Sequence, residues 1–352
     1  MGGRGPTCAR VCDGRRPGSR NACSAEPATA EPWVRSERSG GGSVDVSVVT
    51  TLRNERSTVE PLVRALLAQS SPPDEIVVTD GGSTDGTWER LQALARNEPR
   101  LQGPQAPGGR SAGRNAAIRA ARHDVITCTD GGCRPEPDWL ERLTAPIERG
   151  ADWVAGFYRP SGPTTKATCL GLVIVYVREE VDPATFLPSA RSMAFRRSVW
   201  RQVGGFPEDL DFAEDTLFDQ RLVDAGYRPV FAADAVVRWS PPTTYRQLAA
   251  TAYRWGHGDG LAGLRGPTYR RLLQQYGVTV LAAGAALAID RRLVPLAFAP
   301  LGGLVAARTR HKYRHAEDTT RYLHIPAAHV VANVAALTGF LQGRRRRPGM
   351  TT

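Results

Sequence analysis

The sequence predicts an α/β fold: a mostly parallel sheet with helices on both faces, followed by a helical apolar extension toward the C-terminus. Three observations predict it. Short β-branched runs alternate with helical stretches through the first part of the chain, the order typical of parallel sheets. The runs are apolar throughout, as expected for strands buried on both faces. Helical patterns without intervening strands dominate after residue 243.

Three β-branched runs are the clearest strands. The first, VDVSVVTTL (44–52), leads through the turn RNERS into the helical stretch TVEPLVRALLAQ. The second, DEIVVTD (74–80), ends in GGSTDGT before the helical TWERLQALARN. The third, HDVITCTD (123–130), follows the small-residue helix GRSAGRNAAIRAA (109–121) and ends in the glycine-rich stretch TDGGC (129–133). Each strand is therefore expected to open into a polar turn.

The alternation is less regular after residue 133. PDWLERLTAPIER predicts a helix and DWVAGFY a strand. RSMAFRRSVWRQVGGF indicates a strand or hairpin and then a short helix. AEDTLFDQRLVDAG predicts a helix with Gly226 as its stop signal, and YRPVFAADAVVRW predicts a strand. These elements complete the expected sheet.

The net charge of +11 is concentrated at the two ends of the chain. Residues 1–43 contain seven arginines and four acids, and residues 291–352 contain eleven Lys or Arg and two acids. Residues 44–290 are therefore close to neutral. A nucleic-acid-binding domain would carry a basic face on the domain itself, so we expect no nucleic-acid partner. Basic segments beside apolar helices favour an anionic membrane surface.

The N-terminal residues 1–43 predict a disordered tail, because Gly, Pro, Ser and Arg dominate and little can be buried. Cys8, Cys12 and Cys23 lie there without zinc-site spacing, and no signal peptide precedes them. Free thiols in a reducing cytoplasm are the simplest interpretation. Cys128 and Cys133 are expected at a buried strand end.

Acidic residues follow the predicted strands at the position where open α/β sheets bind ligands. They are Glu55 after the first strand, Asp80 after the second and Asp130 after the third, and the pair Glu214-Asp215 opens a later helix. Singly, each has a structural explanation as a turn former, a helix cap or a charge at a helix N-terminus. Three acids at equivalent strand ends predict a ligand site.

The motifs as a set resemble those of family 2 glycosyltransferases, which have the GT-A fold. The resemblance covers residues 45–260 and is carried by an ordered series of segments: VSVVTTLRNE (46–55), EIVVTDGGSTDGT (75–87), SAGRNAAIRAA (111–121), TDGGC (129–133), FRRSVWRQVGGF (195–206) and AEDTLFDQRLVDAGY (213–227). It implies a GT-A domain over residues 44–260. The alternation of apolar and cationic segments beyond it predicts a helical membrane-associating region over 261–343 and a basic tail over 344–352.

The resemblance implies a role for each matched residue. Glu55 and Asp80 would contact the base and ribose of a nucleotide-sugar, since carboxylates accept hydrogen bonds from N–H and O–H groups. Arg114 would lie near the diphosphate. Asp130 would be the first acid of the family's Asp-x-Asp signature, near ribose and metal. Asp215, paired with Glu214, would be the general base that deprotonates the acceptor hydroxyl.

The sequence departs from this signature at Gly132, which stands where the family has the second acid, the usual metal ligand. Glycine offers a hard cation only a backbone carbonyl. Three interpretations stay open: Mg²⁺ or Mn²⁺ held by Asp130, the donor diphosphate and water; charge stabilisation by Arg114 and other cations without metal; or an inactive domain. The intact Glu214-Asp215 pair argues against the last.

A segment beyond the predicted base, VVRWSPPTTYRQLAATAYRWGHGDG (236–260), resembles the aromatic and basic stretch with which processive and lipid-linked members close the donor site. It implies that Arg254 and Trp255 bind the donor, although the family's Gln-x-x-Arg-Trp form is reduced here to Arg-Trp. His257 and Asp259 fall among glycines, which favours a turn.

Three apolar pieces lie near the C-terminus, at residues 276–289, 293–307 and 325–341. The first two are each shorter than the ~20 residues that a spanning helix requires, and the third runs into RRRR (344–347). Because they alternate with cationic clusters, we expect the first two to form a hairpin in or on the membrane, at its cytoplasmic face. Core helices packed on the catalytic domain are the alternative.

The sequence therefore predicts an inverting glycosyltransferase that moves a sugar from a nucleotide donor to an acceptor hydroxyl on a lipid or envelope glycan. A catalytically impaired sugar-nucleotide-binding protein is a second hypothesis, motivated by Gly132. A sugar nucleotidyltransferase is a third, but TTLRNERS lacks the glycines of that class's phosphate loop.

Overall fold

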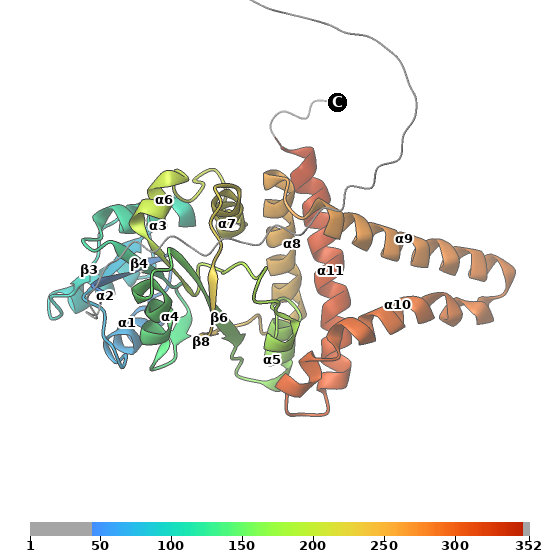
Figure 1. The fold of residues 1–352 in the computed structure, drawn as a ribbon. Coiled ribbons are helices and arrows are strands. Elements are labelled where there is room, and N and C mark those ends of the chain that lie inside the picture. Colours follow the sequence, from blue (N-terminus) through green and yellow to red (C-terminus); the bar gives the residue numbers. More distant parts are fainter. Residues whose placement is uncertain (1–43, 348–352) are drawn as a thin grey trace, which may run out of the picture. The chain divides into compact units, whose positions relative to one another are not determined.

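The computed structural model describes residues 44–347, and in this part of the chain eight strands form one mixed sheet (Figure 1). The expected tail 1–43 and residues 348–352 lie outside the described residues. The strands are β1 (Val46–Leu52), β2 (Glu75–Asp80), β3 (Leu101–Gln102), β4 (Val125–Cys128), β5 (Cys133–Pro135), β6 (Trp153–Pro160), β7 (Met193–Arg196) and β8 (Val230–Trp239).

Helices join and cover these strands, and further helices follow them. They are α1 (Val59–Leu67), α2 (Thr87–Ala95), α3 (Arg110–Ala120), α4 (Trp139–Glu148), α5 (Thr165–Leu172), α6 (Arg197–Gln202), α7 (Glu214–Asp224), α8 (Tyr245–Ala262), α9 (Gly266–Ile289), α10 (Val294–Thr309) and α11 (Arg321–Arg345). Short 3₁₀ turns are η1 (Arg178–Glu180), η2 (Arg291–Leu293) and η3 (Lys312–His315). The predicted strand–helix alternation is confirmed.

The strand order is β3-β2-β1-β4-β7-β6-β8-β5, and it brings the functional strand ends together. β1 pairs in parallel with β2 and β4, so the residues that follow these three strands lie at the same end of the sheet. β7 runs antiparallel to β4, with Met193 opposite Cys128. The residues that enter β7 therefore lie at that same end.

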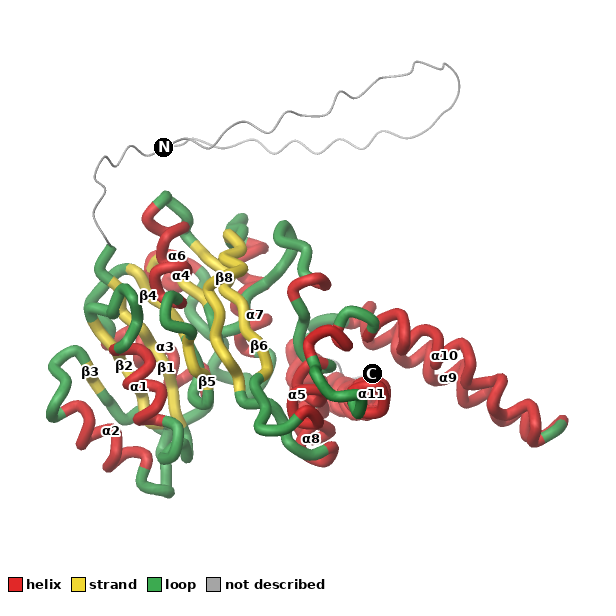
Figure 2. The backbone as a smooth tube through the Cα atoms, turned by 90° about the horizontal axis from the view of Figure 1, so that it is seen from below, coloured by secondary structure: helices red, strands yellow, loops and turns green. Residues whose placement is uncertain are grey.

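Both faces of the sheet are covered by helices, as the sequence predicted (Figure 2). Neighbouring residues of β1 show the division: Val48 packs in the cluster that contains the apolar residues of α1 and α4, and Val49 packs in the cluster of α3, α6 and α7. Both valines are fully buried. The strands read as continuous apolar runs because each residue meets a helix on one face or the other.

The C-terminal part is helical, and α11 packs along α8 through glycines. A Cβ atom at Gly256 of α8 would meet the backbone of Ala336, and one at Gly339 of α11 would meet the carbonyl of Tyr253. These glycines allow the two helix backbones to approach closely. His257 and Asp259 consequently lie inside α8, and the turn expected there was wrong, because the glycines are contact residues between helices.

Helices α9 and α10 form a hairpin that projects away from α8 and α11 (Figures 1 and 2). Its surface carries exposed apolar side chains: Val278, Val280, Leu281, Leu287, Ile289, Leu293, Leu296 and Phe298. The hairpin expected from the sequence is present, and nothing in the described residues covers this face.

Two C-terminal helices are longer than the sequence suggested. α9 has 24 residues and α11 has 25, and both are long and apolar enough to cross a membrane by length and composition. The expectation that the piece at 276–289 is too short was wrong, because α9 begins ten residues earlier, at Gly266. The piece at 293–307 lies in α10, which has 16 residues. Within the most apolar window, 17% of residues are buried in α9 and 33% in α11.

Candidate active site

The TDGGC stretch is a tight turn that places an acid beside the first strand. A Cβ atom at Gly131 would lie 2.7 Å from Cδ2 of Leu52 and 3.3 Å from Cγ of Glu55, so only glycine allows this approach. Gly132 follows with φ at +73°, in the left-handed region that favours glycine. The turn therefore holds Asp130 close to Glu55, at the C-terminal end of the parallel strands.

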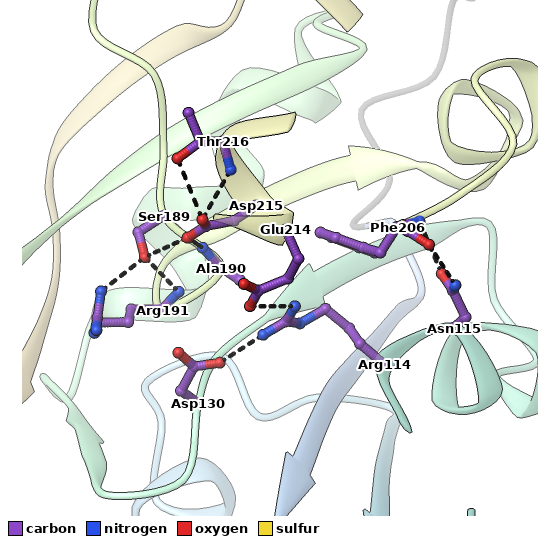
Figure 3. A network of polar contacts seen from close by, with 10 residues as sticks. All are labelled: Arg114, Asn115, Asp130, Ser189, Ala190, Arg191, Phe206, Glu214, Asp215 and Thr216. Carbon is purple, nitrogen blue, oxygen red and sulfur yellow. Dashed lines mark hydrogen bonds and ion pairs between the residues drawn. The ribbon is translucent and has the colours of Figure 1, made fainter. Parts of the chain in front are cut away.

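Arg114 is the centre of the polar network at this end of the sheet (Figure 3). Its side chain on α3 is 1% exposed, and its Nη2 lies 2.9 Å from Oδ1 of Asp130. Its Nη1 lies 3.4 Å from Oε1 of Glu214. One buried guanidinium thus joins the acid that follows β4 to the acid that opens α7.

The guanidinium group of Arg114 packs against the aromatic ring of Phe206, and Asn115 holds the backbone of Phe206 in place. The guanidinium carbon of Arg114 lies 4.8 Å from the ring centroid of Phe206. The amide nitrogen of Asn115 donates to the carbonyl of Phe206 at 2.8 Å, and its oxygen accepts from the Phe206 N–H at 3.0 Å. Asn115 therefore fixes the loop before α7 to α3.

The charges in this network shift the pKa values of both acids. Burial and the neighbouring charge of Asp215 raise the pKa of Glu214 to about 7, and Arg114 only partly offsets them. Burial also acts to raise the pKa of Asp130, but Arg114, Arg191 and Arg110 together hold it below its usual value. Asp130 is therefore ionised at neutral pH, and Glu214 is close to half-protonated.

Asp215 is half-buried at the start of α7, and its carboxylate is held on both sides. Oδ2 accepts from the hydroxyl of Ser189 at 3.1 Å and from the N–H of Ala190 at 3.4 Å, and Oδ1 accepts from the N–H of Thr216 at 2.8 Å (Figure 3). The residue before the pair, Ala213, has φ at +65°, a strained conformation for a residue with a Cβ.

Arg191 is a residue of this region that the sequence did not single out. Its Nη1 donates to the Ser189 hydroxyl at 3.0 Å, and its guanidinium carbon lies 4.8 Å from the ring centroid of Trp239, 5.4 Å from that of Tyr158 and 5.7 Å from that of Trp255. The rings come from β6, β8 and α8, so no local sequence pattern could have revealed this cage.

A cavity of about 580 Å³ opens beside these groups, a volume suited to a small-molecule ligand. Asp130, Arg191, Glu214 and Asp215 line one side of it. Residues of α8, α9, η3 and α11 line the opposite side, including Asp259. The C-terminal helices are therefore part of the cavity wall.

The remaining predicted residues lie in different surroundings. Trp255 lines the cavity, whereas Arg254 is exposed and lies over the ring of Phe212, which is itself part of the lining. Glu55 is half-buried and accepts a hydrogen bond from Thr58.

Asp80 is fully buried at the end of β2. Its Oδ2 accepts from the N–H groups of Gly82 at 3.2 Å and Ser83 at 3.1 Å. Its Oδ1 has no hydrogen-bond partner within the described residues.

The donor set for a divalent cation is small. No group of three or more His, Cys, Asp or Glu residues within residues 44–347 is arranged to hold a metal ion. Asp130 offers Oδ2, which makes no hydrogen bond or ion pair in the described part of the chain, while Oδ1 is bound to Arg114. This single hard oxygen ligand fits a cation that takes its other ligands from the donor's diphosphate and water.

Two family models match the chain. The one described as glycosyl transferase family 2 matches residues 47–176, and the one described as glycosyl transferase family 21 matches residues 112–288. The chain belongs to glycosyltransferase family 2. The two matches together run from β1 to α9, so they contain the whole Arg114 network of this glycosyltransferase.

Relatives and solved structures agree with this assignment. The succinoglycan biosynthesis protein ExoA of Rhizobium meliloti (strain 1021) is 28% identical over 275 residues, which cover 74% of this glycosyltransferase and 82% of ExoA. The pre-mycofactocin glycosyltransferase of Mycobacterium tuberculosis (strain CDC 1551 / Oshkosh) is 27% identical over 72% of this chain, which spans 55% of that relative's length.

A mannosyltransferase of Pyrobaculum calidifontis, solved with GDP-Man and Mn²⁺, has the same fold. Its TM-score to this glycosyltransferase is 0.53 at 22% identity, over 88% of this chain and 91% of the mannosyltransferase. The predicted GT-A fold is therefore confirmed, and the family matches show that the protein is a glycosyltransferase.

The raised pKa of Glu214 predicts a pH-dependent effect of Glu214→Gln on stability. Between the ordinary value of 4.5 and about 7, the folded chain binds more protons at this residue than the unfolded chain, so stability falls as pH rises. Glutamine cannot ionise. The wild type should therefore lose about 3 kcal/mol of unfolding free energy relative to the variant between pH 5 and 8, at roughly 1.4 kcal/mol per pKa unit.

Urea denaturation at a series of pH values measures this difference. Glu89→Gln, a substitution at an exposed position of α2, is the matched control and should give a flat profile. A pH-independent difference for Glu214→Gln would contradict the buried, raised-pKa state of that residue.

Proposed function

We propose that this glycosyltransferase transfers one sugar, with inversion at the anomeric carbon, to a hydroxyl of a lipid or envelope glycan at the cytoplasmic face of the membrane. The observation that carries the proposal is the placement of Asp215. Its carboxylate lines the same cavity as Asp130, the acid paired with Arg114, and as Arg191, so a base and a cation face one ligand-sized space.

The donor would bind on the side of the parallel strands. Glu55 and the unpartnered Oδ1 of Asp80 are placed at strand ends to accept hydrogen bonds from the base and ribose. Arg191 lines the cavity, and Arg114 lies directly behind Asp130 at 2.9 Å; guanidinium groups placed in this way favour a diphosphate. Trp255 offers a ring face to the sugar, and Arg254 lies beyond the cavity lining, where a cation would attract the anionic donor.

Transfer would be a single displacement. Asp215 accepts the proton of the acceptor hydroxyl while that oxygen bonds to the anomeric carbon, and the bond from this carbon to the diphosphate oxygen breaks. Arg114 and Arg191 stabilise the charge that develops on the leaving nucleoside diphosphate. Ser189 and Thr216 hold the Asp215 carboxylate in orientation by their hydrogen bonds. Attack from the face opposite the leaving group inverts the configuration.

Asp130 is the residue that would hold a divalent cation, Mg²⁺ or Mn²⁺. When bound, the cation would neutralise charge on the diphosphate. Support comes from the free Oδ2 of Asp130 and from the mannosyltransferase of the same fold, which was solved with Mn²⁺. Gly132 adds no side-chain ligand. Arg114 and Arg191 would neutralise part of the same diphosphate charge.

Membrane association is supported by the α9–α10 hairpin. Its apolar surface is exposed; Leu281, for example, is 75% exposed. No acid lies between Asp290 at the hairpin tip and Glu317, a stretch that contains six Lys or Arg. Apolar surface together with cationic residues is the pattern that binds anionic lipid headgroups. A relative from Rhizobium johnstonii that is 31% identical over 34% of this chain is named dodecaprenyl-phosphate galacturonate synthase.

Asp215→Asn tests the base. The substitution keeps the shape of the side chain but removes its ability to accept a proton, so the transfer rate should fall by about 10²- to 10⁴-fold, the usual contribution of a general base. The donor is first chosen as the nucleotide-sugar that most raises the melting temperature of the purified protein. Release of nucleoside diphosphate then measures turnover.

The matched control is Asp224→Asn, at the exposed far end of the same helix. It should leave turnover and melting temperature unchanged. Asp215→Asn should still respond to the donor in the thermal-shift assay. Wild-type turnover in Asp215→Asn would contradict the base assignment.

Leu281→Glu tests the hairpin. A charge on this apolar face should weaken binding to vesicles of phosphatidylcholine and phosphatidylglycerol several-fold, because the carboxylate must be desolvated or excluded. Gln274→Glu adds the same charge to an exposed polar position of α9 and should have a much smaller effect. Co-sedimentation measures both. Equal binding by the two variants, or no binding by the wild type, would contradict membrane association through this face.

A further inference from the structure

Asp219 lies one helical turn after the proposed base on α7. Residues four apart on a helix share one face, with Cβ atoms about 5–6 Å apart. Both Asp215 and Asp219 line the same cavity. Asp219 therefore lies on the same helix face as Asp215, next to the group that would deprotonate the acceptor.

The surroundings of Asp219 give it no structural role. The residue is 1% exposed, and neither carboxylate oxygen has a hydrogen-bond partner among the described residues. The apolar packing of α7 is made by Phe218 and Leu222, which belong to the core cluster shared by α3, α6 and α7. A buried carboxyl that neither pairs nor packs is costly to the fold.

Asp259, another buried acid of the cavity lining, does have polar partners within the protein. Asp259 of α8 accepts a hydrogen bond from the hydroxyl of Tyr269 at 2.7 Å and lies 3.8 Å from Nη1 of Arg265. Asp219 has no such contact. The contrast indicates that its partner is a ligand rather than the protein.

The protonation state of Asp219 suits a neutral ligand. Burial and the charge of Asp215 raise its pKa well above its usual value, and Arg265 only partly offsets them. A protonated carboxyl offers one O–H donor and two acceptor oxygens, which is the pattern that pairs with a hydroxyl group. Arg265, Arg308 and Lys312 also line the cavity and would attract a phosphate, but none of them hydrogen-bonds to Asp219.

Aromatic rings line the same cavity. Tyr176, Phe186 and Tyr269 belong to its lining. Flat apolar faces beside hydrogen-bonding carboxyls match a sugar ring, which has apolar C–H faces and a rim of hydroxyls. A plain alcohol or an isoprenyl phosphate would leave Asp219 without a partner.

We propose that Asp219 is an acceptor-binding residue that hydrogen-bonds a second hydroxyl beside the one Asp215 deprotonates, so that the reacting end of the acceptor is a sugar. This inference rests on the proposed function and specifies its acceptor. The membrane would then hold an acceptor whose sugar end enters the cavity.

Acceptor probes test the sugar class. With the donor chosen by thermal shift, nucleoside diphosphate release is measured with p-nitrophenyl glycosides of glucose, galactose, mannose and N-acetylglucosamine, with p-nitrobenzyl alcohol and with farnesyl phosphate. At least one glycoside should accelerate release above the rate without acceptor, and the alcohol and the phosphate should not. Acceleration by farnesyl phosphate that is abolished by Asp215→Asn would overturn the inference and leave the proposed function standing.

Variants of Asp219 test its contact with the best glycoside. Asp219→Leu should raise the acceptor KM about tenfold, the cost of roughly one lost hydrogen bond to a buried group, with a smaller change in donor KM. Asp219→Asn, which still donates and accepts, should recover part of this loss. Asp224→Asn is the control and should change neither constant. An unchanged acceptor KM in Asp219→Leu would contradict the contact.

Stability gives a readout that needs no acceptor. Because Asp219 has no hydrogen-bond partner among residues 44–347, Asp219→Asn and Asp219→Leu should melt at or above the wild-type temperature, as at positions kept for function at a cost in stability. A fall of several degrees in Asp219→Asn would show that the carboxyl has a structural partner, and would overturn the inference.

Discussion

The buried guanidinium of Arg114 is the interaction on which the arrangement of the site depends. A charge that is 1% exposed is tolerated only with opposite charges in contact, and here they are Asp130 and Glu214. One acid follows β4 and the other opens α7, so satisfying a single side chain fixes the distance between the strand ends and the helix that carries Asp215. The ring of Phe206, whose backbone is held by Asn115, packs against the same guanidinium.

The C-terminal helices line the site and also carry the exposed apolar hairpin. Glycine contacts hold α11 against α8, and α8 presents Trp255 and Asp259 to the cavity while α9 adds Tyr269. The exposed hairpin begins in the same helix α9. A surface suited to lipid and a cavity suited to a sugar are thus joined by one continuous helix, which would place a membrane-bound acceptor within reach of the base.

The sequence predicted those features that depend on neighbouring residues. The acids at strand ends were predictable because parallel strands must bring Glu55, Asp80 and Asp130 to one end of the sheet. Arg191 was not, because its aromatic partners lie on three distant elements. Neither was the partnerless state of Asp219, which depends on the tertiary packing around α7. The glycines of α8 misled for a related reason, since a glycine that permits helix contact looks in sequence like one that makes a turn.

A double-mutant cycle on Arg114 and Asp130 tests the central interaction most directly. Arg114→Met, Asp130→Asn and the double variant are compared with the wild type by urea denaturation. If the buried pair organises the site, each single change should be destabilising, Arg114→Met by about 3–5 kcal/mol, and the double variant should be more stable than the sum by at least about 1 kcal/mol. Additive effects within about 0.5 kcal/mol would show that the two residues are energetically independent and would contradict the account.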